Sequence, residues 1–283
     1  MNELLLRDPQ PAEVILNGEK TYAVGEKISN GKFGQVFACR DGWGQPRILR
    51  IVRPFSRNYE NLRETWSQQA AELRRVQHPN LVYIFDSFES DGLFHLVLER
   101  CDYRLDQHFA SPVWDGARWL RAIAGSVLGA LDHVHRAGYL HMNLHPHNLF
   151  CQVPLERLDP DSPFSGVLKL GDLGVNTLVG KVDVLNTKLP RWLVPPEYLS
   201  PSECGPMDHR MDIYQAGLLL LCVLQGRITL YSFEEISVGA PERNARQLAS
   251  GYGEVVARAL RPEVDDRFRN AREFWEALSG VSR

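Results

Sequence analysis

The spacing of the apolar residues changes once along the chain, near Glu99. Before this point, short apolar runs alternate with turn residues such as DGWGQP and ESDG, a pattern typical of antiparallel strands. The runs are YAVGEKIS, GQVFACRD, RILRIVRP, LVYIFDSF and LFHLVLER. One helix is predicted among them, from about Asn58 to Gln77, because apolar side chains recur there at helical spacing. The inward stripe of this helix is Leu62, Trp66, Gln69, Leu73 and Val76, of which only Gln69 is polar.

After Glu99 the helical spacing dominates. The segment WDGARWLRAIAGSVLGALDHVHRAG predicts a helix that Gly138 ends. A later segment, DIYQAGLLLLCVLQG, is apolar nearly all round, so we expect it in the middle of this half. The fold class is therefore predicted as α+β: a small antiparallel sheet with one helix, followed by a larger helical lobe. A ligand is expected in the cleft between two such lobes.

Composition, charge and cysteine spacing argue against several classes of protein. The chain has 283 residues, 44% of them apolar, which suffices for one large domain or for two lobes that share an interface. A net charge of −3 favours neither a nucleic-acid partner nor an acidic membrane surface. The five cysteines show no CxxC spacing, and the longest apolar run, AGLLLLCVL, is too short for a membrane segment. The first residues lack the features of a signal peptide, so a cytoplasmic location is expected.

A series of short motifs lies between about Val24 and Leu278, in an order and at a spacing typical of one protein family. They are SNGKFGQV, ILRI, HPNLV, LVLERC, HMNLHPHNLF, GDLG, PPE, MDIYQAG and DDRF. In this order they resemble the protein kinase family, and the ending VVARALRPEVDDRFRNAREFWEAL is most similar to bacterial serine/threonine kinases. The resemblance implies a two-lobed kinase-like fold, with a small lobe over residues 22–100 and a large lobe over residues 101–283. Residues 1–21 are expected to form a loosely held N-terminal extension.

Several positions that are structural in this family are kept. The resemblance places Glu197 and Arg267 at a buried ion pair that holds the large lobe together. It places Asp212 at a buried acid that binds the backbone around the catalytic loop. It implies that His141 packs and orients this loop and does not transfer a proton.

The positions that carry phosphoryl transfer differ from the family pattern. Asn143 stands where the family has its catalytic aspartate, and an amide has no basicity near neutral pH. The lysine that contacts the transferring phosphate is replaced by His145, and the lysine of the third family strand by Arg50. The glutamate that pairs with this second lysine is replaced by Gln69, so the family's ion pair cannot form. Because phosphoryl transfer depends on positioning and charge neutralisation, these changes argue against catalysis.

Other family positions are kept in part. An arginine that normally receives a phosphorylated activation loop is Met142, so a phosphate on Thr177 or Thr187 is not expected to order that loop. The two magnesium-binding positions survive as Asn148 and Asp172, either as a working cation site or because Asp172 caps backbone. The implied nucleotide-binding positions are Gly31, Gly34, Val36, Ile48, Arg50, Glu99, Cys101 and Phe150. Ile48 and Phe150 are larger than the usual residues, which predicts a narrowed adenine slot.

The leading hypothesis is a pseudokinase: a catalytically inactive scaffold or allosteric module that binds a protein partner and no nucleic acid. The alternative is an atypical enzyme that uses ATP and magnesium to transfer phosphate or nucleotide by an altered route. The leading hypothesis predicts no required cofactor, with at most weak binding of ATP and magnesium. The chain could also be one domain of a longer receptor or regulator.

Overall fold

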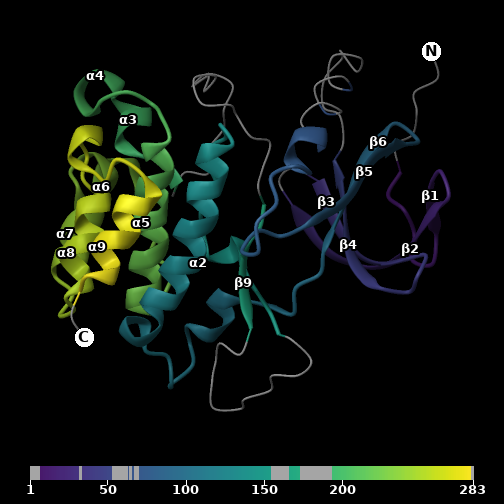
Figure 1. The fold of residues 1–283 in the computed structure, drawn as a ribbon, viewed down its shortest axis with the longest axis horizontal. Coiled ribbons are helices and arrows are strands. Elements are labelled where there is room, and N and C mark those ends of the chain that lie inside the picture. The colour runs from purple at the N-terminus through teal and green to yellow at the C-terminus, as the bar shows by residue number, and fades with distance from the viewer. Residues whose placement is uncertain are drawn as a thin grey trace. The chain divides into compact units, whose positions relative to one another are not determined.

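The computed structural model describes residues 7–31, 34–52, 63, 66, 70–153, 166–172 and 193–281. The chain divides into two compact units. The first comprises Met1–Gln77 and Val82–Arg100, and the second comprises His78–Leu81 and Cys101–Arg283. Figure 1 shows strands in the first unit and mainly helices in the second, as the change of apolar spacing near Glu99 predicts.

The first unit is built on a six-stranded antiparallel sheet with the order β1-β2-β3-β4-β6-β5. Its core includes Phe37, Leu49, Ile51 and Val97, and in β4 the buried Leu49 and Ile51 alternate with more exposed residues. The strands are β1 (Val14–Asn17), β2 (Lys20–Gly31), β3 (Gly34–Asp41), β4 (Pro46–Val52), β5 (Ile84–Ser90) and β6 (Leu93–Glu99). All the strands predicted from the sequence are present, and β1 is an addition to them.

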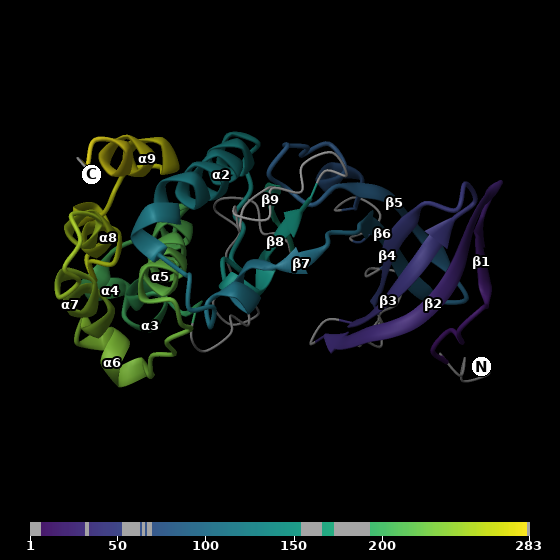
Figure 2. The ribbon, with the colours of Figure 1, turned by 90° about the horizontal axis from the view of Figure 1, so that it is seen from below.

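Strand β1 corrects the expectation of a loose extension over residues 1–21. Val14 pairs with Ala23 and Asn17 pairs with Lys20, so β1 and β2 form a hairpin (Figure 2). Ile15 is 8% exposed and belongs to the core of the sheet. The four-residue run VILN escaped prediction because it is short and follows two prolines, as many linkers do.

The helix predicted before His78 is present at its described positions. Residues 63, 66 and 70–73 are helical, and the chain turns at residues 74–75, slightly before the predicted end at Gln77. Trp66 stacks on Phe94 of β6, with ring centroids 5.2 Å apart. Gln69, the polar member of the predicted stripe, lies outside the described residues.

The second unit is organised by two long helices, α2 (Gly116–Arg136) and α5 (Arg210–Gln225). Asp115 caps α2 by accepting a hydrogen bond from Arg118 N, and Gly138 follows its end with a φ of +86°. Residues 211–223 of α5 are all buried, as its nearly uniform apolar character predicts. Leu120, Ile123, Val127, Leu131 and Val134 of α2 are each fully buried.

Shorter elements complete this unit (Figure 2). A three-stranded sheet has the order β7-β8-β9, formed by Tyr103–Arg104, Leu149–Gln152 and Val167–Leu170. The helical elements are η1 (Leu105–His108), η2 (Pro146–Asn148), α3 (Pro196–Leu199), α4 (Pro201–Cys204), α6 (Phe233–Ser237), α7 (Ala240–Arg246), α8 (Tyr252–Ala259), η4 (Val264–Asp266) and α9 (Ala271–Ser279). Within the part of the chain that the structure describes, none of the helices combines the length and apolar character needed to cross a bilayer.

Candidate functional site

A buried carboxylate in the first turn of α5 organises the loop between α2 and β8. Asp212 is fully buried and accepts hydrogen bonds from the backbone N–H groups of His141 and Met142, both at 2.7 Å. Its Oδ2 also lies 2.9 Å from His135 Nε2. Burial alone would raise the pKa of Asp212, but the contact with His135 and the hydrogen bond from His141 N hold it below its usual value. The carboxylate therefore stays ionised and fixes the loop from beneath.

A second polar side chain of α5, Gln215, holds the same loop one turn further on. Its Oε1 accepts a hydrogen bond from Leu144 N at 3.2 Å, and its Nε2 donates to Leu193 O at 2.9 Å. Gln215 is fully buried and was not among the residues singled out from the sequence. The available signal was its position: a glutamine three residues after Asp212 in a helix that is otherwise apolar must have buried partners.

The structure brings Asn143, Asn148 and Asp172 together. The Nδ2 of Asn143 donates to Asp172 Oδ2 at 2.5 Å, and the Nδ2 of Asn148 donates to the backbone oxygen of Asn143 at 2.9 Å. The backbone of Gly171 in turn donates to Asn148 O at 2.7 Å. Asp172 has a φ of +52°, a strained conformation for a residue with a side chain, and the contact with Asn143 helps to hold it.

Two buried histidines of this loop are held in the neutral form. Burial lowers the pKa of His145 to about 4, and the proximity of His147 adds to the effect. The Nδ1 of His145 accepts a hydrogen bond from His147 N at 3.2 Å and so caps η2. Burial also lowers the pKa of His141, which is 1% exposed. Its Nδ1 accepts from Asn143 N at 3.3 Å, a packing and orienting contact.

Met142 packs in an apolar cluster where the family has a cation. Together with Leu140 and Met211 it forms a buried cluster, against which Tyr198 and Met207 pack. Its φ of +60° turns the chain between His141 and Asn143. Thr177 and Thr187, the phosphate acceptors considered from the sequence, lie outside the described residues.

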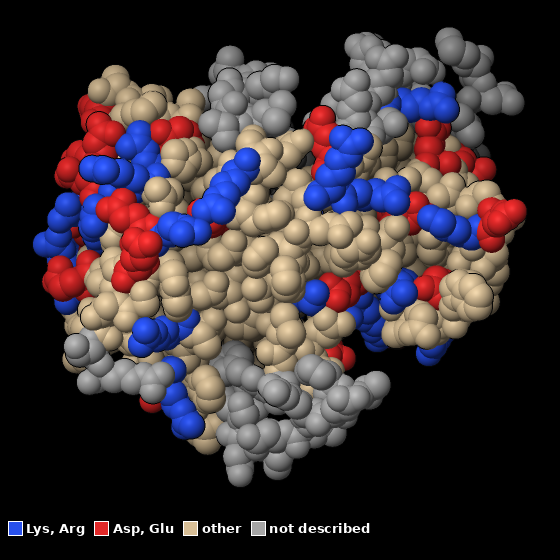
Figure 3. All heavy atoms as spheres, viewed as in Figure 1, with Lys and Arg blue, Asp and Glu red and all other residues tan. Residues whose placement is uncertain are grey.

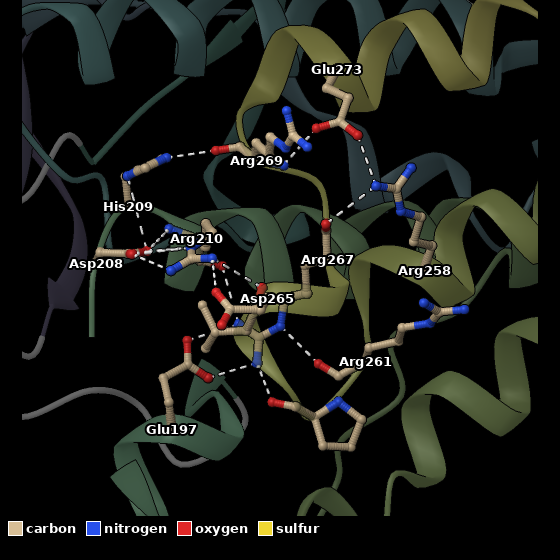
Figure 4. A network of polar contacts seen from close by, with 12 residues as sticks. Glu197, Asp208, His209, Arg210, Arg258, Arg261, Asp265, Arg267, Arg269 and Glu273 are labelled. Carbon is tan, nitrogen blue, oxygen red and sulfur yellow. Dashed lines mark hydrogen bonds and ion pairs between the residues drawn. The ribbon is translucent and has the colours of Figure 1, made fainter. Parts of the chain in front are cut away.

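Glu197 and Arg267 form a two-pronged ion pair in which both side chains are fully buried (Figure 4). Arg267 Nη1 and Nη2 lie 2.8 Å and 2.7 Å from the two carboxylate oxygens. The remaining N–H groups of Arg267 donate to the backbone oxygens of Arg261, Pro262 and Arg210. The guanidinium is therefore fully hydrogen-bonded, as a buried charge requires.

Most of the remaining predicted nucleotide-binding positions lie in the first unit. In the sheet, Val36 pairs with Arg50, and Ile48 pairs with Leu98. The β2–β3 hairpin pairs Gly31 with Gly34. The backbone N–H of Glu99 donates a hydrogen bond to Tyr83 O at 2.9 Å.

Cys101 and Phe150 belong to the second unit, where Phe150 of β8 pairs with Lys169. Since Ile48 and Phe150 are in different units, the narrowed adenine slot stays a prediction.

Comparison with known proteins identifies the family. Residues 22–272 match the protein kinase domain. The serine/threonine-protein kinase pkn3 of Myxococcus xanthus is 25% identical over 281 residues, covering 93% of this chain and 50% of pkn3. The serine/threonine-protein kinase PrkC of Bacillus subtilis is 23% identical over 221 residues, covering 77% of this chain and 32% of PrkC. This chain thus spans half or less of the length of these relatives.

The solved structures show the same fold. The PknI kinase domain of Mycobacterium tuberculosis superimposes with a TM-score of 0.66 at 22% identity, over 91% of this chain and 95% of that domain. The sequence match and this likeness agree on a small sheet unit followed by a helical unit. The chain belongs to the protein kinase domain family.

Proposed function

We propose that this protein is a pseudokinase, a kinase-like domain that binds a protein partner without transferring phosphate. The observation that carries the proposal is the hydrogen bond from Asn143 Nδ2 to Asp172 Oδ2 at 2.5 Å. In the family pattern the position of Asn143 holds the base that accepts a proton from the substrate hydroxyl. Here the same position donates a hydrogen bond to a neighbouring carboxylate and has no basic lone pair with which to accept the proton.

The same contact weakens the case for a magnesium ion. A cation at Asp172 needs the lone pairs of the carboxylate, and one carboxylate oxygen already accepts from Asn143. The amide of Asn148 could still offer its oxygen, because its Nδ2 is the atom bound to Asn143 O. One partly engaged carboxylate and one amide oxygen make a poor set for Mg²⁺, so we expect weak or no binding of Mg-ATP.

The charged groups that neutralise the transferring phosphate are also changed. His145 replaces a lysine, and with a pKa of about 4 it is uncharged at neutral pH. Arg50 and Gln69 replace the ion pair of the small lobe, and an arginine does not reproduce the compact charge of a lysine. Groups of this kind act as a unit, so restoring one of them is not expected to restore activity.

The first test is incorporation of radioactive phosphate from Mg-ATP into the protein itself and into a general protein substrate. We expect no labelling above background by the wild type, and none by Asn143→Asp. Labelling that is robust in the wild type and lost in Asp172→Ala would contradict the proposal and favour an atypical enzyme. Calorimetry with Mg-ATP gives a second measurement, in which we expect no binding tighter than the high-micromolar range.

A further inference from the structure

The turn between β3 and β4 presents one tryptophan almost entirely to solvent. Trp43 is 91% exposed, the largest exposed fraction among the large apolar side chains of the described residues. Burial of a side chain of this size stabilises a fold several times more than burial of a methyl group. An exposed tryptophan forgoes this contribution to stability. Large exposed aromatic side chains are instead enriched among the residues that anchor protein–protein interfaces.

The backbone beneath Trp43 is held rigidly. Asp41 Oδ1 accepts hydrogen bonds from Trp43 N at 3.0 Å and from Gln45 N at 2.9 Å. Gly44 N donates to Asp41 O at 2.8 Å, and Arg40 Nη1 donates to Gly44 O at 2.8 Å. Gly44 has a φ of +75°, which favours glycine. Because these contacts hold the backbone of the turn before any partner arrives, docking need not order that backbone, which lowers its entropic cost.

The same carboxylate connects the turn to a neighbouring aromatic pair. Asp41 Oδ2 lies 3.0 Å from Arg47 Nη2, and the Arg47 guanidinium stacks 3.9 Å from the centroid of the Phe85 ring. Phe85 meets Tyr83 edge to face at 4.6 Å, and these two side chains are 36% and 37% exposed. Most of the exposed aromatic side chains among the described residues therefore lie at this end of the first unit.

Basic side chains surround these aromatic residues. Arg40 and Arg100 are exposed, and the charges of Arg47 and Arg100 both act on the buried Cys39 beneath the turn. In this part of the first unit three basic side chains, Arg40, Arg47 and Arg100, stand against two acidic ones, Asp41 and Glu99, although the whole chain has a net charge of −3. On the face drawn in Figure 3, blue basic and red acidic side chains lie beside one another.

We propose that Trp43, Tyr83, Phe85, Arg40, Arg47 and Arg100 form a docking surface for an acidic, apolar segment of a partner protein. The indole of Trp43 is the anchor, and carboxylates of the partner pair with Arg40 and Arg100. The inference rests on the proposed binding function and names the chemistry of the partner. Arg47 is a supporting residue, because Asp41 and Phe85 already hold its guanidinium.

The test begins with selection of a displayed random-peptide library on the full chain. We expect enrichment of peptides that combine aspartate or glutamate with aromatic or aliphatic residues. The affinity of single synthetic peptides, measured by fluorescence polarisation, should fall at least about tenfold with Trp43→Ala. Arg100→Glu should weaken the same peptides several-fold, and added salt should do so as well.

Matched variants decide between outcomes. Leu16→Ala removes another exposed apolar side chain of the same sheet, 62% exposed, and should leave peptide affinity unchanged. Trp43→Ala should melt within about 1 °C of the wild type, since an exposed side chain contributes little to stability. Trp43→Phe should recover part of the affinity, because an aromatic ring remains.

Several results would overturn the inference. One is a set of enriched peptides whose affinity is the same on Trp43→Ala. Others are enrichment of basic peptides, self-association in sedimentation that Trp43→Ala abolishes, or Trp43-dependent binding of oligouridine instead of peptide. These results concern peptide binding, whereas the proposed function is tested by phosphate labelling from ATP. Failure of the docking surface is therefore distinguishable from failure of the proposed function.

Discussion

At the scale of single residues, the replacement of an aspartate by Asn143 changes a repulsive pair into an attractive one. The amide of Asn143 donates to Asp172 at 2.5 Å, and a second carboxylate in its place would meet a like charge. The identity of Asn143 was visible in the sequence, but the hydrogen bond was not. The reason is that the contact depends on the left-handed backbone of Met142 and Asp172, which only the folded chain shows.

Restoring the aspartate should therefore destabilise the protein at neutral pH. In Asn143→Asp, repulsion raises the pKa of one of the two carboxyl groups, so the folded state binds a proton more tightly than the unfolded state. Its contribution to stability is complete at low pH and is lost as the pH rises through the raised pKa. By thermal melting at pH 7.5 we expect a loss of about 1–2 kcal/mol relative to the wild type, and near equality at pH 4.5.

Two controls, added Mg²⁺ and the variant Asn143→Ala, separate the effect of the new charge from the effect of the lost hydrogen bond. Millimolar Mg²⁺ should raise the melting temperature of Asn143→Asp and leave that of the wild type unchanged. Asn143→Ala loses the hydrogen bond without gaining a charge, so its deficit should not depend on pH in this range. Equal stability of Asn143→Asp and the wild type at pH 7.5 without magnesium would contradict the described contact.

His145 provides a second prediction at this scale, of opposite direction in pH. Its pKa is about 4 in the folded protein, below the usual value of about 6.5, so acid favours the unfolded state. The stability is complete above pH 6.5 and is lost as the pH falls toward 4, by up to about 3 kcal/mol for this group. His145→Asn, which keeps an acceptor for His147 N, should lose less stability between pH 7 and pH 4.5 in urea titrations.

The loss of stability at acid pH should be smaller in His145→Asn than in the wild type, but it should not disappear. His95 in the first unit is 2% exposed, and burial lowers its pKa to about 4 as well. A second variant, His95→Gln, should therefore reduce the loss by a comparable amount. If His145→Asn shows the same acid profile as the wild type, His145 is not buried in its neutral form.

At the scale of elements, the strand missed from the sequence is part of the fold of the first unit. Besides the pairing of β1 with β2, the buried carboxylate of Asp86 on β5 accepts from Asn17 Nδ2 at 2.9 Å, Lys20 Nζ at 3.1 Å and Tyr22 OH at 2.7 Å. Burial alone would raise the pKa of Asp86, but these donors hold it below its usual value. The longer elements were predictable because their apolar spacing repeats, whereas β1 has too few residues to show a period.

Two neighbouring residues of β1 should therefore respond very differently to truncation. Ile15 is 8% exposed and lies in the core, whereas Leu16 is 62% exposed on the opposite face. Ile15→Ala should cost about 2–4 kcal/mol of unfolding free energy by urea titration, and Leu16→Ala less than about 0.5 kcal/mol. Similar costs for the two variants would mean that β1 is not packed in this register.

At the scale of the whole molecule, much of the architecture could be predicted from the sequence. The division near Glu99 and the buried α5 required only apolar spacing and turn residues, whereas the kinase-like motifs were recognised by resemblance to the family. The hydrogen-bond partners of Gln215 and the apolar setting of Met142 could not be predicted, because each depends on which segments meet α5 after folding. Local patterns specify elements, while the partners of a buried polar group are a property of the assembled unit.

The Glu197–Arg267 ion pair gives a prediction at this scale, since it joins segments 70 residues apart in the chain. Both side chains are fully buried, so removing one partner leaves an uncompensated charge in the interior. Glu197→Leu and Arg267→Met should each lower the unfolding free energy by about 3–5 kcal/mol in urea titrations. The double variant Glu197→Leu with Arg267→Met should lose clearly less than the sum of the single variants, because no charge remains to be desolvated. Additive losses in the double variant would show that the two residues act separately. In that case the hydrogen bonds from Arg267 to the backbone oxygens of Arg261 and Pro262, not the ion pair, would carry the stability.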